Sequence, residues 1–260
     1  MLNRRNALLG GLAIASLPTL AQGGRISQLG DAINMAGAQR MLSQRMGKAW
    51  LGQLRPELAE RARQVLQASE VRFERQLGEL LAYAPTPEIV GSYKAMRHRF
   101  GDYRALLQSA PSPTRVDELL LTSGEMLSIA QLATGQLQER SPENSARLVN
   151  LAGRQRMLSQ RLALYFLAGQ QGARPDLVRN ETAMARAEFE VALEALGSAR
   201  EATPAIRANL ALAQSQWVFL QSALAGESQG PKAASDVFVA SENLLAVMET
   251  VTGQFARQLG

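Results

Sequence analysis

The sequence contains no cysteine and a single histidine, His98. Without cysteine no disulfide can form, so packing must stabilise the fold without covalent cross-links. One histidine, with no carboxylate at metal-binding spacing from it, provides no donor set for zinc or iron, and we predict neither a metal site nor a cofactor. Because His98 stands between Arg97 and Arg99, we expect it to be a solvated helix residue.

Aromatic residues are also scarce, at 5% of the 260 residues, whereas hydrophobic residues as a whole reach 46%. A chain of this length and composition can bury a sizeable core. That core must be built mainly from Leu, Ala, Val and Met, which suits the packing of helix against helix. The composition therefore predicts an all-α fold.

No stretch of the chain concentrates charge of one sign. The 28 Lys and Arg residues exceed the 23 Asp and Glu residues by five, and they are spread along the sequence. Binding to DNA or RNA requires a clustered basic surface, so we do not expect a nucleic-acid partner. Nucleophile-elbow, phosphate-loop and dinucleotide signatures are missing as well, and we predict that the protein is not an enzyme.

Long hydrophobic runs are missing except near the N-terminus. Residues 1–21 combine Arg4 and Arg5, an apolar run over 7–17 and a small-residue end at Ala21. This pattern predicts a twin-arginine export signal cleaved near Ala21, and hence a periplasmic protein. Ala7 replaces the usual bulky residue, so the ordinary secretory route stays open. An uncleaved anchor is the alternative, although the run is shorter than the roughly 20 residues of a membrane span.

Nine prolines beyond the signal segment divide the chain into eight stretches, each long enough for one helix. Proline disrupts a helix interior but is accepted in the first turn. The predicted helices span 27–54, 57–83, 88–108, 113–139, 143–171, 176–200, 204–225 and 232–258. Four residues that precede a proline are predicted helix caps: Thr86, Ser112, Ser141 and Thr203.

The eight predicted helices form two sets of four. INMAGAQRMLSQRM at 33–46 aligns with VNLAGRQRMLSQRL at 149–162, and weaker matches continue along both halves. Short connections favour up-down antiparallel bundles. We therefore predict two tandem four-helix units, at 27–140 and 143–258, which either stack end to end or pack side by side.

The aligned window is identical at 10 of 14 positions, including most of its polar residues. Packing alone would preserve the apolar positions and let the polar ones vary. At 100° per residue, Gly37, Arg40 and Gln44 fall within about 60° of one another on a helix. Glycine permits close approach, and the guanidinium fork suits a planar oxyanion or carboxylate. Arg40 and Arg156 could therefore converge on one small anion.

A structural interpretation of the same residues remains open. The arginines could form internal ion pairs, with Glu125 or Glu249 as partners, or extend to the solvent. Gly37 and Gly153 would then serve only close helix packing. The two interpretations predict different surroundings for the guanidinium groups.

The string N-x-A-G-x-Q-R-M-L-S-Q-R resembles the signature of the N-terminal domain of type IV pilus methyl-accepting chemotaxis transducers. That domain is related to the periplasmic sensor domain of nitrate/nitrite sensor kinases. The resemblance implies an extracytoplasmic four-helix sensory bundle whose central motif arginine, glycine and later arginine lie at the anion site. It departs from the nitrate sensors at Met35 and Leu151, where these have lysine. The expected ligand-binding residues are Gly37, Arg40, Gln44, Arg45, Gly153, Arg156, Gln160 and Arg161.

The sequence thus predicts an exported sensor that recognises a small anion, nitrate-like or a carboxylate. No output segment is recognisable, so we expect the signal to pass to a separate membrane-bound transducer or sensor kinase. A homodimer is a further possibility. The rival hypothesis is a helical interaction or scaffold protein of pilus or chemosensory machinery that binds no ligand.

Overall fold

The computed structural model describes residues 26–226 and 231–259, and in these ranges it is all-α. The expected signal segment lies outside the described residues. The helices are α1 Leu29–Gly52, α2 Ala59–Tyr83, α3 Pro87–Leu107, α4 Val116–Gln138, α5 Asn144–Gly169, α6 Pro175–Ser198, α7 Pro204–Leu224 and α8 Pro231–Ala256. A short 3-10 turn, Pro113–Arg115, precedes α4. Each helix lies within a few residues of its predicted range, which confirms the fold class.

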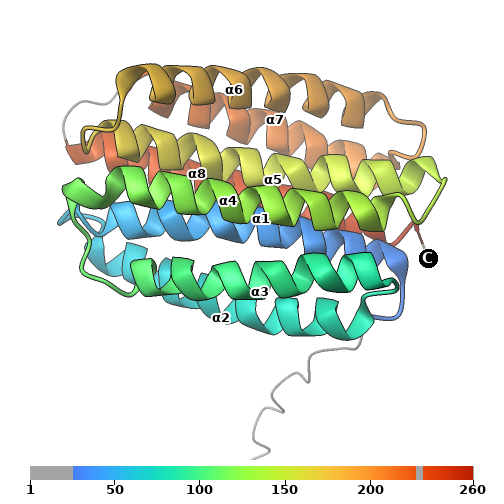
Figure 1. The fold of residues 1–260 in the computed structure, drawn as a ribbon. Helices are drawn as coiled ribbons and strands as arrows, with labels where there is room; N and C mark the ends of the chain where they lie inside the picture. The colour runs from blue at the N-terminus through green and yellow to red at the C-terminus, as the bar shows by residue number, and fades with distance from the viewer. Residues whose placement is uncertain (1–25, 227–230, 260) are drawn as a thin grey trace, which may run out of the picture.

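The two four-helix units pack side by side. Figure 1 shows four layers of paired helices in the order α6 and α7, α5 and α8, α4 and α1, then α3 and α2. The most extensive helix contact in the molecule joins α1 to α5, and α1–α8 and α4–α5 contacts extend the seam between the units. The two helices that carry the repeated motif therefore meet at the centre of the molecule.

Equivalent positions of the two units play equivalent parts in the core. Phe73 stacks on Phe100 with ring centroids 4.3 Å apart, and Phe189 stacks on Trp217 at the same distance. The sequence repeat pairs these residues as Phe73 with Phe189 and Phe100 with Trp217. Repeated sequence thus encodes repeated packing, and one continuous hydrophobic core runs through both units.

Side-chain caps mark the starts of α3, α7 and the 3-10 turn. The hydroxyls of Thr86 and Thr203 accept hydrogen bonds from the backbone N–H groups of Ile89 and Ile206, as predicted for caps before proline. Ser112 caps the 3-10 turn in the same way. The prediction for Ser141 is wrong: its hydroxyl accepts from the Glu143 N–H in a turn, and α5 begins only at Asn144.

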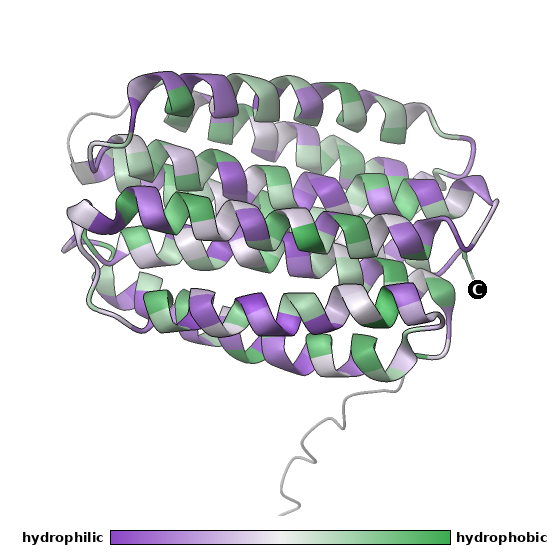
Figure 2. Cartoon of the chain, viewed as in Figure 1, coloured by the Kyte–Doolittle hydropathy of each residue, from purple (hydrophilic) through white to green (hydrophobic). Residues whose placement is uncertain are grey.

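Hydrophobic and hydrophilic residues are mixed along every helix, as Figure 2 shows. Most apolar side chains face neighbouring helices, and most charged ones lie on the outside, with Arg40, Lys48 and Arg156 among the buried exceptions. No helix in the described ranges is long and apolar enough to cross a membrane.

Candidate anion site at the seam between the units

The motif helices α1 and α5 run parallel and pack closely against each other at Gly37 and Gly153. A Cβ atom built on Gly37 would lie 3.8 Å from the Gly153 Cα, and one built on Gly47 would lie 3.2 Å from Leu164 Cδ1. Residue numbers thus increase together along both helices, as in a pair related by a two-fold axis. The glycines permit this approach because they have no side chain.

Arg40 and Arg156 converge at this crossing. The Cβ position of Gly37 lies 3.2 Å from Arg40 Nη2 and 3.3 Å from Arg156 Nη2, so both guanidiniums border the same small space. Each arginine reaches across to the other copy of the motif. Arg40 Nη2 donates to the Asn150 carbonyl at 3.2 Å, and Arg156 Nη2 donates to the Asn34 carbonyl at 2.9 Å.

The central guanidiniums are buried, yet neither forms an ion pair within the described residues. Arg40 is 0% exposed and Arg156 is 2% exposed. Apart from the two carbonyls, their side-chain partner is Gln131 of α4, whose Oε1 accepts from Arg40 Nη1 at 2.6 Å. The Nε atoms of both arginines have no hydrogen-bond partner in this part of the chain. Each central guanidinium therefore keeps an N–H group that no described residue accepts from.

The environment penalises the charged form of both groups. The pKa of Arg40 is lowered to about 9, chiefly by burial and in smaller part by the positive charges of Arg154 and Arg156. Burial also lowers the pKa of Arg156 to about 10, with Glu249 opposing the shift and Arg72 adding to it. An anion placed between the two guanidiniums would relieve this penalty.

The carboxylates expected as structural partners bind other arginines. Glu249 pairs with Arg72 at 2.6 Å, and Glu125 pairs with Arg99. The structural interpretation is therefore wrong about Glu125 and Glu249 as partners of the motif arginines, although two of these arginines, Arg45 and Arg161, do form internal ion pairs. Its expectation of close packing at Gly37 and Gly153 is confirmed.

The later motif arginines, in contrast, are held by carboxylates. Arg45 Nε donates to Glu242 of α8 at 3.0 Å, and Arg161 Nε donates to Glu181 of α6 at 3.1 Å. Both side chains are mostly buried, at 17% and 16% exposure. These two arginines are thus engaged in ion pairs away from the glycine crossing.

Gln44 and Gln160 tie each motif helix to the fourth helix of its own unit. Gln44 Nε2 donates to the Ser123 carbonyl at 3.1 Å, and Gln160 Nε2 donates to the Ser241 carbonyl at 2.9 Å. Gln44 Oε1 also accepts from Arg161 Nη1, which links the two units. The arrangement brings four of the eight expected site residues together and places the other four in supporting contacts.

Sequence reasoning missed Lys48, which is 0% exposed. Its Nζ lies 2.6 Å from Glu242 Oε1, 3.0 Å from Ser241 Oγ and 4.2 Å above the Phe238 ring centroid. Arg45, Lys48 and Glu242 form a buried charge cluster between α1 and α8. A signal for it existed, since a lysine stands within the otherwise apolar end of α1, but its partner lies 194 residues away.

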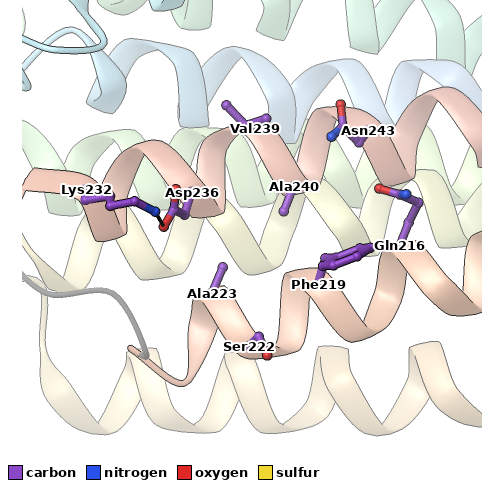
Figure 3. A pocket seen from close by; sticks show the side chains of 9 residues that line it. All are labelled: Gln216, Phe219, Ser222, Ala223, Lys232, Asp236, Val239, Ala240 and Asn243. Carbon is purple, nitrogen blue, oxygen red and sulfur yellow. Dashed lines mark hydrogen bonds and ion pairs between the residues drawn. The ribbon is translucent and has the colours of Figure 1, made fainter.

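Pockets lie on both sides of the arginine centre, and others lie apart from it. Figure 3 shows one of the pockets that lie apart from the centre, which has a volume of about 540 Å³ and lies between α7 and α8. Its lining includes Phe219, Asn243 and the paired Lys232 and Asp236, and no motif residue reaches it. No cluster of metal-ligating side chains occurs in residues 26–226 and 231–259.

Comparison with known families agrees with this doubled architecture. The family model described as "Type IV pili methyl-accepting chemotaxis transducer N-term" matches residues 26–122 and again 138–241. The chain belongs to this family. Its domains are sensory modules of chemotaxis transducers and are typically periplasmic. No curated protein and no solved structure matches the chain.

Proposed function

We propose that the chain is an exported periplasmic sensor module that binds one small anion between Arg40 and Arg156 and signals to a separate transducer. The observation that carries this proposal is the convergence of two buried guanidiniums at the Gly37–Gly153 crossing, where no carboxylate of the described residues pairs with them. The family supports a sensory role. The kinship to nitrate/nitrite sensors remains part of the proposal.

The charge balance of the centre favours an anionic ligand. A buried charge is costly unless it is paired, and the Asn34 and Asn150 carbonyls compensate the two cations only partly. A planar oxyanion or carboxylate accepts parallel hydrogen bonds from a guanidinium fork. Nitrate, nitrite and small carboxylates all have this geometry.

Both halves of the site come from one chain. Arg40 lies on α1 and Arg156 on α5, and each touches the motif backbone of the other unit. A second molecule is therefore unnecessary for binding, and we expect one site per chain. A ligand at this seam would bias the contact between the units, which is a route for a signal to reach the helix ends.

A ligand-free scaffold is the second candidate, and one observation favours it. Arg45 and Arg161 are engaged by carboxylates, and hydrogen bonds from Gln44 and Gln160 join the motif helices to the fourth helices of their units. A motif kept only for packing would contain such contacts. It would not by itself require two unpaired cations at its centre.

Thermal unfolding with and without anions distinguishes the two functions. Nitrate, nitrite or acetate at 100 times its dissociation constant should stabilise the wild type by about 2.7 kcal/mol. Arg40→Gln and Arg156→Gln should lose this shift, whereas Arg97→Gln, at an exposed arginine of α3, should keep it. If the folded wild-type protein shows no stability shift with any small anion, the sensor proposal is wrong and the scaffold function remains.

A further inference from the structure

The two approaches to the arginine centre differ. On one side lies a pocket of about 380 Å³, here named the α2/α8 pocket, whose lining includes Asp31, Asn34, Ala38, Arg72, Arg156 and Glu249. This size falls within the roughly 300–1,000 Å³ range of small-molecule sites. The pocket reaches a central arginine directly, because Arg156 forms part of its wall and the Nε atom of this buried side chain has no partner among the described residues.

The opposite approach is blocked by an arginine. The pocket between α4 and α6, about 570 Å³, is lined by Gln131, Arg154 and Glu188 but not by Arg40. Arg154 Nη1 donates to Gln131 Oε1 at 2.9 Å, the same oxygen that accepts from Arg40. At the equivalent position of the first unit, 116 residues earlier, stands Ala38. The approach through the α2/α8 pocket is thus open because Ala38 stands where the second unit has Arg154.

A carboxylate stands beside the open approach. Glu249 lies at the position equivalent to Gln131, by the same offset that pairs Thr134 with Thr252. It is close enough to Arg156 to influence its pKa, yet its ion pair is with Arg72 of α2, at 2.6 Å. Both members are about one-third exposed. The Glu249 carboxylate is thus paired with Arg72 and not with the guanidinium that an entering anion needs.

The charges around the pocket also indicate the valence of the ligand. Arg72 and Arg156 line the pocket together with two carboxylates, Asp31 and Glu249, and Arg40 lies beside Arg156 at the glycine crossing. One positive charge remains unbalanced. A singly charged anion neutralises it, whereas a dianion would leave an excess negative charge at a buried site.

We propose that the α2/α8 pocket is the entrance to the arginine centre, that the Arg72–Glu249 pair is its gate, and that the gate selects singly charged small anions. This inference rests on the proposed function. In the absence of Arg72, Glu249 occupies Arg156 and competes with the ligand. Glu249 is thus a specificity-determining residue.

Anion titrations by calorimetry on the full chain test this proposal. The variants are Glu249→Gln, Arg72→Gln, their combination, and Glu188→Gln as a control that removes the same charge from the opposite pocket. Glu249→Gln should bind nitrate and acetate roughly three- to tenfold more tightly, and should gain more for sulfate. Glu188→Gln should stay within about twofold of the wild type.

The double variant separates a gate from a general charge effect. If Arg72 acts by holding Glu249, Arg72→Gln weakens binding strongly in the wild-type background and only slightly in Glu249→Gln. Equal effects of Glu249→Gln and Glu188→Gln, or a larger effect of the latter, overturn the gate while leaving the anion site intact. Absence of binding in every variant, with folding intact by circular dichroism, overturns the proposed function itself.

Discussion

Removal of Glu242 tests the charge cluster that joins the two units. Glu242→Gln leaves Lys48 buried at 0% exposure without its carboxylate, and leaves Arg45 with Ser69 as its remaining partner. Loss of one partner from a buried ion pair costs about 3–5 kcal/mol. The pKa of Glu242 gives a similar figure: Lys48 and Arg45 overcome the effect of burial and lower it from 4.5 to about 2, which corresponds to about 3 kcal/mol.

Urea unfolding at several pH values measures this contribution. Because the pKa of Glu242 is lowered in the fold, its stabilisation is present above pH 4.5 and is lost as the pH falls towards 2. The wild-type and Glu242→Gln free energies of unfolding should therefore differ by about 3 kcal/mol at pH 6 and converge near pH 2. Glu60→Gln, which breaks an exposed pair with Arg63, should cost less than about 1 kcal/mol.

The pKa of Lys48 predicts a second pH dependence of stability, at alkaline pH, in the same unfolding experiment. Burial lowers this pKa to about 8, so the folded state binds the Lys48 proton less tightly than the unfolded chain does. Stability from this group therefore rises as the pH increases from 8 towards 10.5.

A loss of stability below about 1 kcal/mol in Glu242→Gln at pH 6 would refute the reasoning about the charge cluster, and so would wild-type and variant curves that stay parallel down to pH 2.

Two further predictions concern the arginine centre. Anion affinity, measured by calorimetry, should be constant from about pH 6 to 8, because both central guanidiniums keep their charge in this range although burial lowers their pKa values; an affinity that falls within this range contradicts this. Gly37→Ala places a methyl group 3.2 Å from Arg40 Nη2 and should weaken anion binding roughly tenfold or more. Gly101→Ala, with open space around its Cβ, should leave binding unchanged and add about 0.5–1 kcal/mol of stability. Equal binding by the two glycine variants would show that the Gly37 crossing is not at the ligand.

The helices and their repeat could be predicted because their determinants are local. Proline positions and apolar periodicity define each helix without reference to distant residues. The convergence of Arg40 and Arg156 was also predictable, since repeated sequence on two helices implies equivalent positions that can face each other.

The partners of the buried charged side chains could not be predicted from the sequence, because they depend on packing between the units. Nothing local distinguishes Arg45, which is paired with Glu242, from Arg40, which is not. Lys48 stands in an otherwise apolar stretch, but its partner Glu242 can be identified only once α8 is packed against α1. The difference between the two approaches to the centre likewise follows from Ala38 and Arg154, whose roles become visible only once α1 and α5 are side by side.

The stoichiometry of anion binding tests the central claim most directly. Calorimetric titration of the full chain with nitrate or acetate, at protein concentrations where its mass is verified by light scattering, should give one anion per chain. Arg40→Gln and Arg156→Gln should each abolish it, because one site uses both guanidiniums. Two anions per chain, or binding that survives either substitution, would contradict a single shared site at the seam between the units.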